Sequence, residues 1–124
     1  MEIPASLCDN VRALDPRIRH VGYYDGFGRI QYDSIRPNTK PMEGTEEMHI
    51  LNGTVASTLN LWNPASSMIG KVKSFVMIRE KLTALMSPHK DGYYFLVVFE
   101  AGIALSEVDK IRIYLENAIL SNAA

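Results

Sequence analysis

The chain has 124 residues, of which 47% are hydrophobic and 22% are charged, and it carries a net charge of −1. This size and composition predict one globular domain spanning residues 1–124. Because the charge is close to neutral, we expect neither a nucleic acid nor an anionic membrane as a partner. The longest apolar run, residues 93–99, is too short to cross a bilayer, and a single cysteine with no recognisable signal peptide favours a cytoplasmic location.

The start of the chain predicts a short amphipathic helix over residues 4–14. Leu7, Val11 and Leu14 fall on one side of a helix with about 3.6 residues per turn. Pro16 ends this helix, because proline disfavours helical geometry in the residue before it.

A β-hairpin is predicted over residues 18–35, with the tetrapeptide Asp-Gly-Phe-Gly at 25–28 as its turn. Asp-Gly is favoured in tight hairpins because glycine readily adopts positive φ. A dinucleotide-binding loop would need a third glycine and a helix directly after it, whereas a strand follows here. We therefore expect Asp25 to stabilise the turn and Asp33 to face solvent, rather than the two acting as an acid–base pair.

A loop is predicted over residues 36–45, followed by a middle helix over residues 46–63 with Thr45 as its N-cap. Gly53 lies inside this helix at a cost of about 1 kcal/mol relative to alanine, which indicates either a place where another backbone comes close or a glycine that is merely tolerated. The apolar positions of this helix are Met48, Leu51, Val55, Leu59 and Trp62.

Three further strands are predicted over residues 72–79, 82–86 and 93–99. The last is apolar on both faces, which is typical of a central strand covered on both sides. A final helix is predicted to be capped by Ser106. Its buried stripe comprises Val108, Ile111, Leu115, Ala118 and Ile119.

Together these elements predict an α+β fold in the order α-β-β-α-β-β-β-α. Five strands joined mostly by hairpins are expected to form one mostly antiparallel sheet with residues 93–99 inside it. The first and last helices are expected to cover one face of this sheet, and the middle helix the other.

The sequence offers no constellation of residues for catalysis, for a metal or for a cofactor. His20, His49 and His89 are far apart and show no metal-ligand spacing, and Cys8 has no activating basic neighbour. We therefore expect a protein that is not an enzyme and needs no cofactor. The aromatic residues of the first and last strands are expected to pack across the sheet rather than to stack nucleic-acid bases, and these residues are Tyr23, Tyr24, Tyr93, Tyr94, Phe95 and Phe99.

The order of elements, with Ile-Arg-His-Val-Gly at 18–22 leading a glycine-turn hairpin, resembles the roadblock/dynein-light-chain domains, which are close in plan to longin and profilin-like folds. The resemblance covers residues 3–120. The chain also resembles a group of small archaeal proteins of this shape, through the Leu-Asp-Pro break at 14–16 and the closing hydrophobic strand at 93–100.

The resemblance implies a dimeric platform that binds small Ras-like GTPases and acts by docking rather than by chemistry of its own. Members of the family typically pair through the middle helix and the third strand, here residues 46–63 and 71–79. Lys71 and Lys73 on an edge strand disfavour edge-to-edge pairing, whereas surplus apolar residues favour an interaction surface. The candidate interface residues are Leu51, Val55, Leu59, Trp62, Phe75 and Met77.

The alternative function is a small-ligand sensor of the PAS or longin type, with a pocket between the sheet and the middle helix. This reading requires Met48, Leu51 and Met77, with nearby tyrosines, to line a void instead of filling it.

Overall fold

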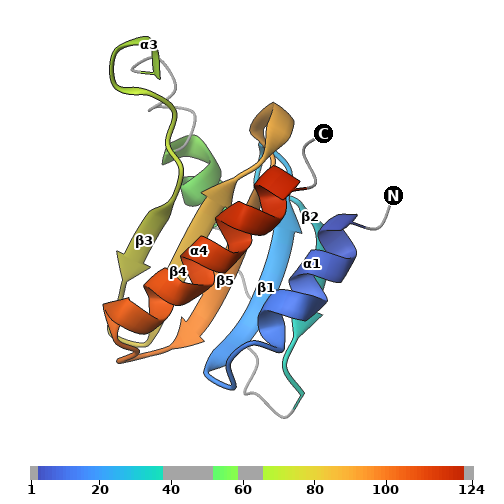
Figure 1. The fold of residues 1–124 in the computed structure, drawn as a ribbon, viewed down its shortest axis with the longest axis vertical. Coiled ribbons are helices and arrows are strands. Elements are labelled where there is room, and N and C mark those ends of the chain that lie inside the picture. The colour runs from blue at the N-terminus through green and yellow to red at the C-terminus, as the bar shows by residue number, and fades with distance from the viewer. Residues whose placement is uncertain (1–2, 38–51, 59–65, 122–124) are drawn as a thin grey trace.

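The computed structural model describes residues 3–37, 52–58 and 66–121, which form a five-stranded antiparallel sheet with helices packed on it (Figure 1). The strands are β1 (Ile18–Tyr24), β2 (Ile30–Ile35), β3 (Phe75–Ile78), β4 (Leu82–Pro88) and β5 (Tyr94–Glu100). The helical segments are α1 (Ile3–Arg12), residues 52–58, α3 (Ser66–Ile69) and α4 (Leu105–Ser121), with a 3-10 turn at Lys90–Gly92. The predicted fold class and the order α-β-β-α-β-β-β-α are confirmed.

The strands are arranged in the order β2-β1-β5-β4-β3, so β5 is the innermost strand, as predicted. Val97 in β5 pairs with Val21 of β1 on one side and with Leu85 of β4 on the other. The six residues 94–99 are each at most 1% exposed, because both faces of the strand are covered. A run that is apolar on both faces is stable only in such a position.

Two hydrophobic cores lie on opposite faces of the sheet. Phe95, Val97 and Phe99 of β5 belong to the core that α1 and α4 cover. The alternate residues Tyr94 and Leu96 belong to a second core, together with residues of the segment 52–58. The prediction that the first and last helices share one face is therefore confirmed, and Figure 1 shows α1 and α4 side by side in front of the sheet.

The hairpin turn forms as the sequence predicts. The Asp25 carboxylate accepts hydrogen bonds from the backbone N–H groups of Phe27 (2.9 Å) and Arg29 (3.0 Å) and from Nε of Arg29 (2.9 Å). Burial acts to raise the pKa of Asp25, but these hydrogen bonds outweigh it and lower the pKa. Asp33 is exposed, so the two carboxylates do not form a pair.

The predicted cap of the final helix is wrong. The final helix starts at Leu105, and the Ala104 carbonyl accepts the first helical hydrogen bonds, so Ser106 lies within the first turn and is not the N-cap. This earlier start places Glu107 in the first turn, where the helix dipole favours a carboxylate. At Gly53 a Cβ would meet no atom of the described residues within 4 Å, so space does not require glycine there.

The backbone that comes near Gly53 is that of Gly28, in the β1–β2 turn. Gly28 has φ +83°, and a Cβ built there would lie 2.8 Å from the carbonyl oxygen of Asn52. The turn therefore packs directly against the backbone of the segment 52–58, and glycine is required for both conformation and space.

Strand lengths differ modestly from the prediction. The third strand is confined to Phe75–Ile78, and the fourth continues to Pro88.

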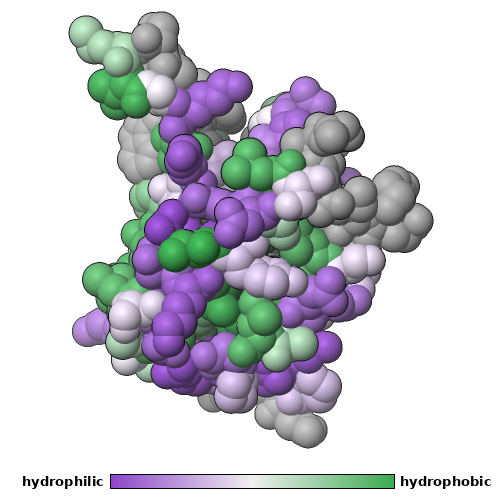
Figure 2. All heavy atoms as spheres, viewed as in Figure 1, coloured by the Kyte–Doolittle hydropathy of each residue, from purple (hydrophilic) through white to green (hydrophobic). Residues whose placement is uncertain are grey.

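Hydrophilic residues cover much of the face formed by α1 and α4, with hydrophobic patches between them (Figure 2). Among the described helices, none has the length and apolar character needed to cross a membrane.

Candidate functional site

The β3 edge, defined as residues 75–78 and the side chains that flank them, is the candidate interaction site. Among the described strands β3 hydrogen-bonds only to β4, and it lies at the end of the sheet (Figure 1). Val76 and Ile78 are 37% and 65% exposed on one face. Phe75 and Met77 are half-buried on the other face, against the second core. An edge strand with apolar side chains on both faces is suited to pairing with another strand.

Basic side chains surround the β3 edge. Lys71 and Lys73 precede the strand, while Arg79 and Lys81 follow it, and all four are exposed. None of them makes an ion pair with another residue that the structure describes. The start of the strand is held instead by Ser74, whose hydroxyl donates to Oε2 of Glu116 in α4 at 2.6 Å.

The segment 52–58 packs next to this edge, on the face that carries Phe75 and Met77. Val55 and Ala56 are each 4% exposed and point into the second core. The Tyr94 hydroxyl donates to the carbonyl of Asn52 at 3.1 Å, which fixes the beginning of the segment to β5.

The structure brings three of the six candidate interface residues into one cluster. Val55, Phe75 and Met77 all belong to the second core or pack against it. Val55 is part of the helical segment 52–58 and is buried in this core. It therefore packs this segment against the sheet and is not itself exposed. Leu51, Leu59 and Trp62 lie outside the described residues. The exposed apolar residues of the strand, Val76 and Ile78, are not among the six candidates. Their strict alternation with Phe75 and Met77 in the sequence indicated that they lie on the opposite face of the same strand.

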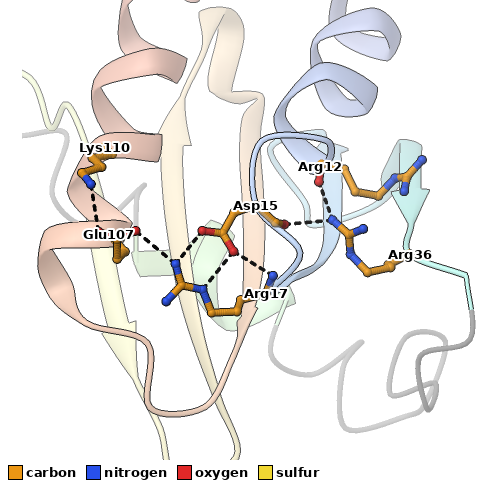
Figure 3. Close-up of polar contacts among 6 residues, drawn as sticks. All are labelled: Arg12, Asp15, Arg17, Arg36, Glu107 and Lys110. Atoms are coloured by element: carbon orange, nitrogen blue, oxygen red, sulfur yellow. Dashed lines mark hydrogen bonds and ion pairs between the residues drawn. The ribbon is translucent and has the colours of Figure 1, made fainter.

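A network of ion pairs joins the α1–β1 loop to the start of α4 (Figure 3). Asp15 accepts three hydrogen bonds from Arg17, through its backbone N–H, Nε and Nη2, at 2.8, 2.9 and 2.7 Å. Arg17 Nη2 also donates to Oε1 of Glu107 at 3.0 Å, and Nζ of Lys110 donates to Oε2 of Glu107 at 3.0 Å. The hydrogen bonds from Arg17 lower the pKa of Asp15 to about 2.

Arg36, just after β2, is a second connection at this end of the molecule. Its guanidinium donates to three backbone carbonyls, those of Arg12 (2.5 Å), Asp15 (2.9 Å) and Ile18 (2.6 Å). Two of these contacts are visible in Figure 3. The carbonyl of Arg12 belongs to the last turn of α1, where a cation is favourable to the helix dipole. Arg36 therefore fixes the end of α1 to the beginning of β1.

A shallow groove of about 260 Å³ lies beside this network, between the end of α1 and the first turns of α4. Its walls are formed by Leu14, Asp15, Glu107, Lys110, Ile111 and Tyr114. Both carboxylates are engaged in ion pairs, and the pKa of Glu107, like that of Asp15, is lowered, chiefly by Lys110 and Arg17. Neither carboxyl group is therefore suited to donate a proton near neutral pH.

The remaining reactive side chains are held in structural contacts. Cys8 is fully buried, and burial raises the pKa of its thiol to about 12, as expected for an inert core residue. His89 Nδ1 lies 2.7 Å from the Tyr23 hydroxyl, and burial lowers the pKa of His89. His20 is buried in β1. His49 lies outside the described residues, and within the described ones no group of three His, Cys, Asp or Glu side chains is placed to hold a metal ion.

The aromatic residues pack across the strands, as predicted. Tyr24 stacks on Tyr94 with ring centroids 5.3 Å apart. On the opposite face Tyr23 contacts Tyr93 at 5.5 Å and Phe95 at 4.7 Å. Because the rings are divided between the two faces of the sheet, they do not form a single platform for stacking bases.

Comparison of the structure with solved structures finds close matches over nearly the whole chain. The gliding protein MglB from Thermus thermophilus matches with a TM-score of 0.73 at 12% identity, covering 95% of this chain and 86% of that chain. A Roadblock/LC7 domain from Streptomyces avermitilis matches with a TM-score of 0.66 at 10% identity, covering 94% and 93%. An MglB in a tetrameric arrangement matches with a TM-score of 0.66 at 13% identity, covering 97% and 90%.

The amino-acid sequence itself matches no family model and no curated protein. The structural matches show that the chain has the Roadblock/LC7 fold, in the form also found in MglB. The fold expected from the order of the elements is thereby confirmed. At these identities the likeness establishes the fold, and the function has to be argued from the surface of this chain.

Proposed function

We propose that this protein is a non-enzymatic interaction module that forms a homodimer through the β3 edge and the neighbouring middle helix. The paired surface would then bind a small Ras-like GTPase or another signalling partner, as the resemblance to the roadblock domains implies. The observation that carries the proposal is the β3 edge itself, which among the described strands pairs only with β4 and carries apolar side chains on both faces.

Pairing through β3 is supported by the exposure of the apolar side chains there. Val76 and Ile78 are apolar side chains exposed to water, and a strand added beside β3 would cover them. Phe75 and Met77 lie on the other face of the strand, against the core that contains Val55. Self-association is also known for this fold, since one of the similar MglB structures has a tetrameric arrangement.

A role as an interaction module also agrees with the chemistry of the described side chains. Asp15 and Glu107, which line the groove between α1 and α4, are both paired with arginine or lysine. The buried thiol of Cys8 is kept protonated. Of the residues that the ligand-sensing alternative requires, Met48 and Leu51 lie outside the described residues, and Met77 packs against the second core, as a filling residue does.

The dimer is tested by measuring the mass of the purified protein with light scattering after gel filtration. Ile78→Glu places a charge on the exposed face of the strand and is expected to weaken self-association at least 10-fold, as for a buried interface position. Ile113→Glu, at an exposed apolar residue of α4, is the matched control and should leave association unchanged. A wild-type protein that stays monomeric at high concentration would contradict the proposal.

The partner is tested by pull-down with the Ras-like GTPases of the host, each loaded with GDP or with a GTP analogue. Specific capture in one nucleotide state is the expected result. Capture of none of them, by a protein shown to be dimeric, would remove the GTPase and leave the homodimeric module.

A further inference from the structure

Lys73 and Arg79, which flank β3, fall on one face of the sheet by strand alternation. Phe75 and Met77 pair with Met86 and Ala84 on the face covered by the segment 52–58. Lys73 and Arg79 stand two positions outside Phe75 and Met77, so alternation places them on the same face. The backbone N–H of Arg79 still bonds to the Leu82 carbonyl at 2.9 Å, which continues the ladder to this residue.

The neighbouring residue Ser74 confirms this alternation. Its hydroxyl bonds to Glu116 of α4, on the opposite face of the sheet, at 2.6 Å. Lys73, one residue earlier, therefore faces away from α4. Glu116 is in addition paired with Arg112 at 3.1 Å, so its charge is already balanced on the α4 side.

A symmetric dimer through the β3 edge brings these cations together. When a sheet continues across a two-fold axis, each residue faces one of the second copy whose side chain lies on the same face. The registers with the greatest overlap of the two strands are centred on Val76 or on Met77. In the first register Lys73 lies opposite Arg79 of the second copy, and in the second Lys73 lies next to the β3–β4 turn of the second copy, which carries Lys81.

Each contact of this kind occurs twice by symmetry, and directly opposed side chains have Cβ atoms about 5 Å apart. Like charges placed in this way oppose pairing. The net charge of the whole chain is only −1, so general repulsion between two copies is weak and the effect arises at this edge.

We propose that the contact between the two β3 edges is completed by a multivalent oxyanion, a phosphate-type group, held between Lys73, Arg79 and Lys81 of both copies. The inference rests on the proposed homodimer. A single copy contributes only half of the cations, so the site is created by association and the anion promotes the dimer. Arginine binds such groups through two parallel hydrogen bonds, and lysine adds compact positive charge.

The test is sedimentation equilibrium of the full chain in about 20 mM NaCl, where charge is poorly screened. Inorganic tripolyphosphate is added, and the reference sample contains NaCl at the same ionic strength. Tripolyphosphate is expected to tighten the dimer about 10-fold beyond the NaCl reference, because it relieves two symmetric pairs of opposed charges.

Charge reversal separates the proposed site from a general salt effect. Lys73→Glu converts the opposed cations into complementary pairs, so this variant should dimerise tightly without tripolyphosphate and should no longer respond to it. Lys90→Glu makes the same change of charge on the exposed connection between β4 and β5, and it should behave as the wild type does. Thermal melting of both variants verifies that they are folded.

The outcomes are distinguishable. If no dimer forms under any condition, the proposed function and this inference are both overturned. If a dimer forms but responds equally to tripolyphosphate and to NaCl, only the anion site is overturned. Binding to vesicles of anionic phospholipid, without any effect of tripolyphosphate on the dimer, would assign the cations to a lipid surface and would also overturn the inference.

Discussion

Replacing Gly28 by alanine tests the contact between the hairpin turn and the segment 52–58. Gly28 has φ +83°, and an added Cβ would lie 2.8 Å from the carbonyl oxygen of Asn52. The left-handed conformation costs a residue with a Cβ about 1 to 2 kcal/mol. The forced shift of backbone atoms costs about 1 to 3 kcal/mol more, as overpacking does. We therefore expect Gly28→Ala to lower the free energy of unfolding by about 3 kcal/mol.

The matched control for this substitution is Gly102→Ala. Gly102 has nearly the same φ, +81°, but a Cβ there would meet no atom within 4 Å. It should therefore show the conformational cost alone, about 1 to 2 kcal/mol.

Urea denaturation and thermal melting measure the difference between these two variants. For 124 residues the entropy of unfolding is about 260 cal/mol/K, so a loss of about 3 kcal/mol lowers Tm by about 11 °C. Equal losses of stability in Gly28→Ala and Gly102→Ala would refute the packing of the turn against the segment 52–58.

Three further substitutions test the connections between elements. The pKa of Asp15 is lowered to about 2 in the folded state against about 3.9 when unfolded, so its stabilising effect is present above pH about 4 and is lost as pH falls toward about 2. The shift corresponds to about 2.5 kcal/mol, and solvent screening reduces this to about 1 kcal/mol because the Arg17 side chain is 45% exposed. Asp15→Asn should lose that much less stability between pH 5 and pH 2, measured by urea denaturation, and an unchanged pH profile would contradict the ion pair. Arg36→Ala removes hydrogen bonds to three carbonyls and should cost about 3 kcal/mol, and hydrogen exchange should show faster opening of α1; a loss below about 1 kcal/mol would mean that water replaces the guanidinium. Gly53→Ala fills open space within a helix and should raise the free energy of unfolding by about 0.5 to 1 kcal/mol. A lower free energy of unfolding in this variant would argue against a helical conformation at Gly53.

The sequence was sufficient for features that depend on alternation and periodicity. Residues 93–99 are apolar at every position, and only the centre of a sheet with two covered faces accommodates such a run. The spacing of Leu7 and Val11 in one helix, and of Ile111 and Leu115 in the other, likewise identified the stripes that now meet in the first core. The turn chemistry of Asp25 followed from local preference, since its partners lie within four residues.

Contacts between distant residues could not be predicted in this way. Arg17 and Glu107 are separated by 90 positions, and their ion pair depends on how α4 is placed over the sheet. The hydrogen-bond acceptors of Arg36 are backbone carbonyls. Every residue has such a carbonyl, so the residue types at these positions do not indicate the contacts. Gly53 was expected to mark the approach of another backbone, but periodicity could not identify this backbone as that of Gly28, which is the glycine that the contact requires. For the candidate site, alternation identified the apolar strand, and the strand order confirms its expected position at an edge of the sheet.

The single cysteine has a practical consequence. Reagents that modify thiols attack the thiolate, and Cys8 is both fully buried and held protonated by the rise of its pKa to about 12. In the native protein it should therefore remain unmodified, and its rate of labelling reports how often α1 separates from the sheet. A cysteine introduced at the exposed Ser57 would be modified selectively, so spin labels or fluorophores can report the distance between two copies while the natural thiol stays in place.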